Sequence, residues 1–269
     1  MASTNYGLPH SNWISPRSRI DSAKVRLFCL PHAGSGTSMY NIWKRFLPPT
    51  VEICPVQIPG RETRLAEPSY NDCALLIAEM TTALAPYTNM PYAIFGHSMG
   101  SLLALDLARS LRSAGLPEPS YLFVSGRNAT HVPMKHGSIH QMPDEEFLSA
   151  LATRYGGLPQ EILDTPELLE LYLPILRADL TLLETHRYEI LAPLACPIAA
   201  FSGKDDPNVS VEGLQAWAEH TTNAFEAKWL DGNHFYLTGP SRALLLEFVG
   251  EKLSQLVSDS PIKAISNAE

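Results

Sequence analysis

Short runs of apolar residues recur along the chain, and their lengths are those of buried strands. In most of these runs nearly every position is apolar, without the alternation of polar residues that a one-sided sheet shows. Strands of this kind are covered on both faces, as they are in parallel sheets. The predicted strands are residues 25–30, 51–54, 92–95, 121–125, 198–201 and 225–230.

Segments with the apolar spacing of helices lie between most of these strands. One of them ends just before Gly115 and Pro117, as helices commonly do. Strands that alternate with helices predict an α/β fold, a mostly parallel sheet with helices on both faces. The helical segments are residues 72–84, 99–113, 211–220 and 241–256.

Residues 143–188 interrupt this alternation. They contain helical patterns at 144–155 and from Thr165 toward Tyr188, with Pro174 inside the second, and no strand pattern. A helical insertion between two strands is a candidate lid over a site at the sheet edge, and we predict a lid here. The alternative is a helical crossover that packs on the sheet without covering a site.

The segment from Gly96 to Gly100 reads G-H-S-M-G and stands between a predicted strand and a predicted helix. A G-x-S-x-G match has little weight alone, but this strand-turn-helix setting is the one in which a sharp turn exposes a nucleophilic serine. The small residues at both ends let neighbouring backbones pass closely. We therefore predict Ser98 as a nucleophile, against the alternative of a glycine turn with an incidental serine.

A serine hydroxyl needs a base to take its proton, and in this type of sheet an acid and then a histidine follow the serine along the chain. His234 comes just after the last predicted strand, in a loop where a scaffold can present a catalytic base. His220 lies at the end of a predicted helix, where it complements the helix dipole. We therefore predict His234 as the base.

The acid is expected in the loop after the preceding strand, which contains Asp205 and Asp206. Asp206 lies three residues after a glycine and three before a valine, the usual spacing after this strand, and is predicted to orient His234. Asp205 is the alternative. Asp231 reads as a turn residue beside a glycine.

Acyl transfer also needs two backbone N–H groups that face the developing oxyanion. One is expected from Met99, the residue after the serine. The other is expected from Ala33, in the small-residue loop 31–36 that follows the first strand. No G-K-[ST] follows this loop, so a phosphate-binding loop is disfavoured.

Composition narrows the classes of function. The chain has 269 residues, 45% of them hydrophobic, and a formal net charge of −8, which disfavours nucleic acid and anionic membranes as partners. The four cysteines lack C-x-x-C spacing and read as free thiols. No segment reads as a signal peptide or membrane span, so a cytoplasmic location is expected. We expect one domain at 25–257 between a loose N-terminal extension (1–24) and a C-terminal tail (258–269).

Motifs for metal or cofactor chemistry are missing. The sequence has no H-E-x-x-H, no zinc-type cysteine spacing and no G-x-G-x-x-G. His131, His136 and His140 lie close together, but in a segment that reads as loop. Neither a metal site nor a cofactor site is predicted.

Several segments, in this order, resemble the type II thioesterases, the stand-alone editing enzymes of nonribosomal peptide and polyketide synthases. The resemblance covers about residues 25–257. Its segments are Leu30 to Gly34 (LPHAG), Pro59 to Glu62 (PGRE), Gly96 to Gly100 (GHSMG), Leu173 to Asp179 (LPILRAD) and Gly232 to Leu237 (GNHFYL).

The resemblance implies an α/β-hydrolase fold and hydrolysis of acyl or aminoacyl thioesters on the phosphopantetheine arm of carrier proteins. It places the triad, the oxyanion donors and the lid on the residues named above. It implies no bound cofactor, and we expect a monomer that binds acyl or peptidyl carrier domains. Ser35, Ser101 and Asn233 stand where the family commonly has glycine, which bears on pocket shape rather than on chemistry.

Other functions fit the same triad. They are a general esterase, a fatty-acyl thioesterase or an acyltransferase and, in another class, a catalytically silent carrier-binding module. Because carriers of this kind are usually acidic, a local basic patch is expected to steer them to this acidic chain. The candidates for that patch are Arg61, Arg64, Arg127 and Lys135.

Overall fold

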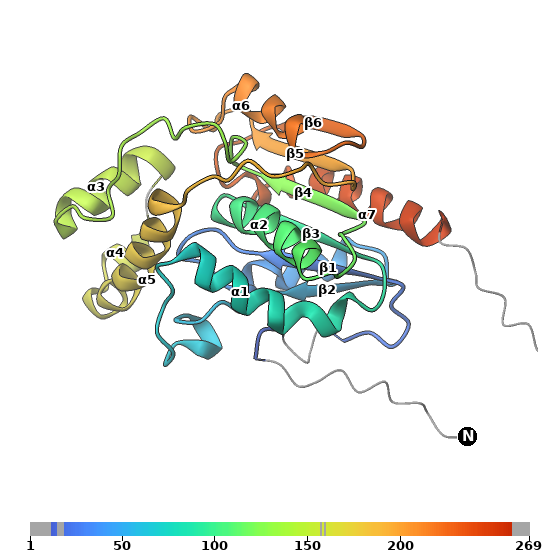
Figure 1. The fold of residues 1–269 in the computed structure, drawn as a ribbon. Coiled ribbons are helices and arrows are strands. Elements are labelled where there is room, and N and C mark those ends of the chain that lie inside the picture. The colour runs from blue at the N-terminus through green and yellow to red at the C-terminus, as the bar shows by residue number, and fades with distance from the viewer. Residues whose placement is uncertain (1–11, 15–18, 157, 159, 260–269) are drawn as a thin grey trace, which may run out of the picture.

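A single parallel sheet forms the centre of the computed structural model, which describes residues 12–14, 19–156, 158 and 160–259. Its strand order is β2-β1-β3-β4-β5-β6, and every neighbouring pair is parallel (Figure 1). All the predicted strands are confirmed, and three of them run one or two residues further. The strands are β1 (Val25–Leu30), β2 (Val51–Pro55), β3 (Tyr92–His97), β4 (Tyr121–Ser125), β5 (Ile198–Gly203) and β6 (Phe225–Leu230).

Alternate strand residues supply two separate cores. On β1, Phe28 and Leu30 belong to the core beneath α1 (Cys73–Leu84) and α2 (Met99–Ser113). Their neighbours Leu27 and Cys29 belong to the core on the opposite face. That second core is closed by the 3-10 helix η2 (Thr37–Arg45) and by α7 (Arg242–Asp259). Burial on both faces explains why the strands read as unbroken apolar runs.

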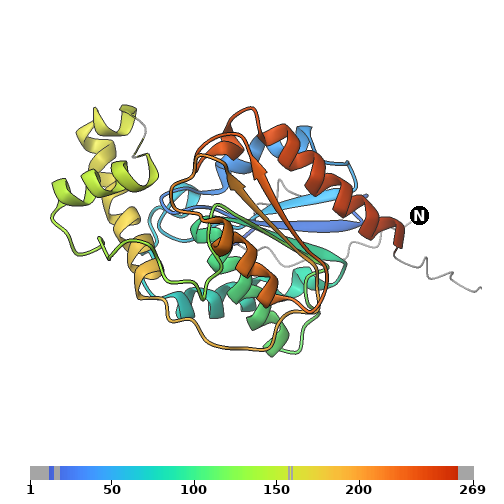
Figure 2. The same cartoon turned by 90° about the horizontal axis from the view of Figure 1, so that it is seen from above.

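The remaining elements are short or belong to the insertion. Figures 1 and 2 show the insertion helices projecting from one end of the sheet. The two helices predicted there are confirmed, whereas α4 was not predicted. The elements are η3 (Glu62–Arg64), η4 (Ala85–Thr88), α3 (Asp144–Tyr155), α4 (Gln160–Leu163), α5 (Pro166–Thr185), α6 (Val211–Gln215), η5 (Ala216–His220) and η6 (Tyr236–Thr238).

The order of the strands decides where a site can form. β1 lies between β2 and β3. The chain therefore adds β2 on one side of β1, and then crosses to add β3 and the later strands on the other side. At such a switch point, loops from the carboxyl ends of the strands diverge and leave a crevice. The loops after β1, β3, β5 and β6 all lie at this end of the sheet, and they carry the residues predicted to act in catalysis.

Parts of the two chain ends pack on the domain. Trp13 and Ile14 are buried, and Ile14 forms an antiparallel bridge with Val56. The expectation of a loose N-terminal extension is therefore wrong for these two residues. Helix α7 continues through residue 259, past the expected start of the tail at 258, and residues 260–269 lie outside the described part.

The cysteines and the helices bear on two further expectations. All four cysteines are free and buried, as predicted. Within the described residues, no helix has the length and apolar character needed to cross a membrane.

Gly100 lies where α2 passes close to the end of β1. A Cβ atom at this position would lie 2.1 Å from the carbonyl oxygen of Leu30, whereas one at Gly137 would meet nothing within 4 Å. We expect Gly100→Ala to lower the free energy of unfolding by about 2–3 kcal/mol because backbone must move. Gly137→Ala is the control and should stay within about 0.5 kcal/mol of wild type. Urea denaturation measures both, and equal values for the two variants would contradict the close approach.

Candidate active site

Ser98 occupies a strained turn between β3 and α2. Its φ of 56° and ψ of −111° are unusual for a residue with a side chain. The turn is held by the Ser98 N–H, which donates to the carbonyl oxygen of Ser125 at 2.8 Å. The Ser101 hydroxyl lies 2.8 Å from the same carbonyl and 2.9 Å from that of Gly96, so it ties β3 to β4 beneath the turn. This gives a structural role to one of the positions where the family commonly has glycine.

The turn brings Ser98 to His234. The Ser98 Oγ lies 3.0 Å from His234 Nε2, and His234 Nδ1 lies 2.7 Å from Asp206 Oδ2. Asp206 is buried, and its other carboxylate oxygen accepts the N–H of Asn208 at 3.0 Å. The structure thus joins the three predicted residues in one hydrogen-bonded chain across 136 positions of sequence.

The alternative residues lie elsewhere. Asp205 is exposed, and Asp231 forms a surface ion pair with Lys204 at 2.6 Å. His220 is buried, with its Nε2 3.0 Å from Nδ1 of His131, and has no contact with Ser98. The geometry therefore favours Asp206 and His234 over their rivals.

Two further histidines, His97 and His32, lie near His234. His97 is fully buried, and its Nδ1 lies 2.8 Å from the Ser125 hydroxyl, which in turn lies 2.6 Å from the hydroxyl of Tyr236. Burial lowers the pKa of His97 well below its usual range, and burial lowers the pKa of His32 to about 4. Both imidazoles are consequently neutral near pH 7.

The candidate oxyanion donors flank the serine. Ala33 and Ser98 line the same cavity. Met99 is the first residue of α2, so its N–H has no acceptor within the helix and is available to a ligand. We call residues 31–36, which follow β1, the β1 loop. The His32 ring stabilises this loop, since its Nδ1 lies 2.9 Å from the carbonyl oxygen of Ala33.

A buried ion pair fixes this loop from the side. Arg61 Nη1 and Nη2 each lie 2.7 Å from an oxygen of Asp179 on α5. One of those oxygens also accepts the N–H of Gly34 at 2.7 Å, and the arginine donates to the carbonyl of Ser35 at 3.1 Å. Both charged side chains are almost fully buried. We call this set the Arg61–Asp179 clamp.

The clamp was not predicted as a unit. Its two charged residues lie in the PGRE and LPILRAD segments, which carry the family resemblance, but nothing in those segments indicates that they pair. They are 118 positions apart along the chain.

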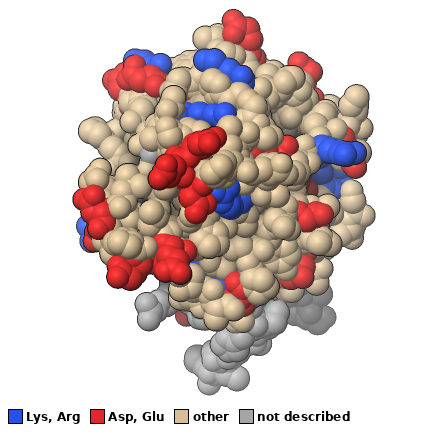
Figure 3. Space-filling model, turned by 90° about the vertical axis from the view of Figure 1, so that its left-hand side faces the viewer, with Lys and Arg blue, Asp and Glu red and all other residues tan. Residues whose placement is uncertain are grey.

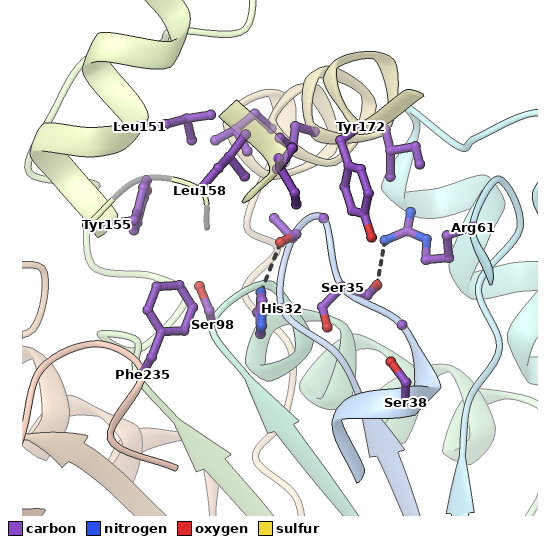
Figure 4. Close-up of a pocket in the computed structure, with 18 of the residues that line it drawn as sticks. His32, Ser35, Ser38, Arg61, Ser98, Leu151, Tyr155, Leu158, Tyr172 and Phe235 are labelled. Atoms are coloured by element: carbon purple, nitrogen blue, oxygen red, sulfur yellow. Dashed lines mark hydrogen bonds between the residues drawn. The ribbon is translucent and has the colours of Figure 1, made fainter. Parts of the chain in front are cut away.

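A cavity of about 700 Å³ opens above Ser98 (Figure 4). Leu151, Leu158 and Tyr172 from the insertion lie on one side of it, opposite Ser98 and His32. Its other end is polar and runs between the β1 loop and the segment that contains Arg61. The aliphatic lining includes Leu151, Leu158, Ile162, Leu171, Ile175 and Leu183.

The predicted basic patch is wrong for Arg61 and Arg64. Both are buried, because Arg61 belongs to the clamp and Arg64 pairs with Glu67 while covering the ring of Trp13 at 4.5 Å. Figure 3 views the side on which the insertion lies, and acidic side chains gather there. The exposed acidic residues of the insertion are Asp144, Glu145, Glu146, Glu161, Asp164, Glu167 and Glu170.

The thioesterase domain model matches residues 25–253 of this chain. The chain belongs to the thioesterase domain family. It is 40% identical over 238 residues to linear gramicidin dehydrogenase LgrE of Brevibacillus parabrevis, covering 87% of this chain and 90% of that protein.

Solved structures agree with this assignment. The RedJ thioesterase from the prodiginine biosynthetic pathway in Streptomyces coelicolor matches with a TM-score of 0.79 and 39% identity, covering 86% of both chains. The type II thioesterase BorB from the borrelidin biosynthetic cluster matches with a TM-score of 0.79 and 35% identity, covering 91% of this chain and 98% of that chain. The predicted α/β-hydrolase fold and thioesterase class are confirmed.

The clamp offers a test of how the β1 loop is positioned. Asp179→Asn leaves Arg61 buried without its counter-charge, so we expect unfolding to become easier by about 3–5 kcal/mol. Asparagine has one acceptor oxygen instead of two, so it cannot serve both Arg61 and Gly34 as the carboxylate does. The loop that carries the expected oxyanion donor Ala33 is then held less firmly, and kcat should fall by about tenfold with a smaller change in KM.

The matched control is Asp144→Asn, which removes the exposed partner of Arg177. It should change the unfolding free energy by less than about 1 kcal/mol. Chemical denaturation and thioester kinetics at a temperature where both variants are folded measure these effects. An unchanged kcat in folded Asp179→Asn would limit the clamp to a role in stability.

Proposed function

We propose that this thioesterase hydrolyses acyl thioesters on the phosphopantetheine arm of carrier proteins, as a stand-alone type II enzyme of nonribosomal peptide or polyketide synthesis. The observation that carries the proposal is the chain Ser98–His234–Asp206 opening into a largely apolar cavity. Family membership and the BorB likeness support it.

The proposed mechanism is two-step acyl transfer. His234 Nε2 takes the proton of Ser98 as the hydroxyl oxygen attacks the thioester carbonyl. Asp206 accepts the Nδ1–H of His234, fixes its tautomer and stabilises the imidazolium. The N–H groups of Ala33 and Met99 hold the oxyanion. The thiol leaves with the proton from His234, and water activated by the same imidazole then releases the acid.

The insertion is proposed to act as a lid that shapes the acyl site. Tyr155, at the end of α3, lies with its ring centre 5.4 Å from that of His234. The aliphatic side chains of the cavity suit a hydrocarbon acyl group, because each buried methylene contributes about 0.8 kcal/mol to binding. The polar end of the cavity suits the amides of the pantetheine arm. We propose that the enzyme needs no cofactor of its own.

The name of one relative denotes a dehydrogenase. This sequence lacks the G-x-G-x-x-G fingerprint of dinucleotide binding. The arrangement of Ser98, His234 and Asp206 is that of a serine hydrolase. We therefore propose hydrolysis rather than hydride transfer.

Carrier proteins loaded with acetyl or octanoyl groups test the proposal directly. We expect wild-type enzyme to remove both groups, the octanoyl group faster, and Ser98→Ala to lose at least about 10⁴-fold in rate because the nucleophile is gone. Intact-protein mass spectrometry of the carrier measures the loss of acyl mass. If wild type leaves both carriers acylated but still cleaves a simple oxygen ester, the enzyme is a general esterase.

Asp206 and its neighbour Asp205 form a natural pair of variants. Asp206→Asn should lower kcat by about 10³–10⁴-fold, because an amide cannot hold the productive tautomer of His234. Asp205→Asn should leave kcat within about twofold of wild type, since this carboxylate is exposed. Steady-state hydrolysis of an acyl-pantetheine thioester measures both. A large loss in Asp205→Asn alone would reverse the assignment.

A further inference from the structure

A second group of reactive side chains lies outside the catalytic cavity. Cys73 is the first residue of α1, Asp106 lies in α2, and His186 follows the last residue of α5. His186 Nε2 lies 2.8 Å from Asp106 Oδ2, and Cys73 Sγ lies 3.7 Å from the same oxygen. The three ligand atoms all lie within 4.8 Å of one another.

These side chains face a cavity of about 460 Å³. Arg109 and Ser110 of α2 also line it, and it shares no lining residue with the cavity above Ser98. Cys73 is buried, while Asp106 and His186 are partly accessible from the cavity. A small ion and a water molecule can therefore reach the cluster without passing the catalytic site.

We propose that Cys73, Asp106 and His186 form a Zn²⁺ site. Thiolate, imidazole and carboxylate are the three donor types that zinc accepts, at bond lengths of about 2.0–2.3 Å. Around a tetrahedral ion such bonds place ligand atoms about 3–4 Å apart. The present separations need only small side-chain movements to reach that spacing. Water from the cavity takes the fourth position.

The charges balance when the ion binds. In the metal-free state Asp106 accepts hydrogen bonds from the Cys73 thiol and from His186 Nε2–H. Zn²⁺ displaces the thiol proton to solvent, and the imidazole moves its proton to Nδ1. Thiolate, carboxylate and neutral imidazole then carry two negative charges, which the ion neutralises.

Arg127 fits this arrangement. Its side chain is partly buried, and its Nε is buried without a hydrogen-bond partner within the described residues. Burial and the Asp106 carboxylate raise the pKa of the Cys73 thiol, and the charge of Arg127 opposes that rise. The cluster carries one negative charge without the ion and none with it, so Arg127 faces no net positive charge in the metal-bound state.

Cobalt(II) is the probe for this site, because it replaces zinc and reports its ligands by absorption. Protein freed of metal with a chelator is titrated with CoCl₂. We expect a near-ultraviolet thiolate-to-cobalt charge-transfer band and visible bands of four-coordinate cobalt, both removed by ZnCl₂. Absence of the charge-transfer band in the wild-type protein overturns the proposal.

Variants assign the signal to this cluster. Cys73→Ser should abolish the charge-transfer band, and Asp106→Asn and His186→Asn should each weaken cobalt binding more than about tenfold. Cys196→Ser is the matched control, because it removes another buried thiol and should keep the band. A cobalt spectrum that persists in Cys73→Ser would place the ion at other histidines, such as those near His234, and overturn the assignment.

Two readouts separate this proposal from protein folding and from the proposed function. ZnCl₂ should raise the Tm of wild type and of Ser98→Ala equally, and should raise that of Cys73→Ser much less. Ser98→Ala should keep the cobalt spectrum, since its substitution lies outside the cluster. If thioester hydrolysis fails, the proposal of a metal site is therefore unaffected. If cobalt binding fails, the proposal of a hydrolase is unaffected.

Discussion

The bidentate ion pair between Arg61 and Asp179 is the constraint on which the catalytic arrangement depends. Burying two charges costs several kcal/mol of desolvation, and their attraction offsets this only where geometry is good and the remaining polar atoms find partners. Here the planar guanidinium meets both carboxylate oxygens, and Gly34 and Ser35 supply further contacts, while Arg61 Nε is left without a hydrogen-bond partner within the described residues. One interaction therefore positions the β1 loop, the Arg61 segment and helix α5 relative to one another.

Helix α5 has two functionally different halves that meet at Pro174, and the clamp residue Asp179 lies in the second half. From Ile175 onward the helix is anchored in the core by residues such as Leu180 and Leu183. Before Pro174 its residues are half-exposed or exposed, and they cover the cavity. A proline inside a helix removes one backbone hydrogen bond and weakens the junction. A zinc ion at His186 would hold the far end of the anchored half, so adjustment to different acyl groups would fall to the half before Pro174.

Local patterns were enough to predict most of this molecule. Each strand and each long helix follows from its own apolar spacing, and Ser98, His234 and Asp206 follow from their positions just after predicted strands. Contacts between residues that lie far apart in the sequence could not be predicted from local patterns. Arg61 reads as a surface cation until the buried Asp179 is placed beside it. The cluster of Cys73, Asp106 and His186 has no sequence motif, because three helices bring it together. The short α4 lacks enough residues to show a period.

The charge states of the histidines around Ser98 bear directly on the proton transfer to His234. Attack by the hydroxyl creates a positive charge on His234, which needs the buried Asp206 carboxylate beside it. A second charged imidazole would oppose that step, since the ring of His97 lies only 5.0 Å from that of His234. Burial keeps His97 neutral, and burial lowers the pKa of His32 to about 4. Near pH 7 the two imidazoles beside His234 therefore do not compete with it for positive charge.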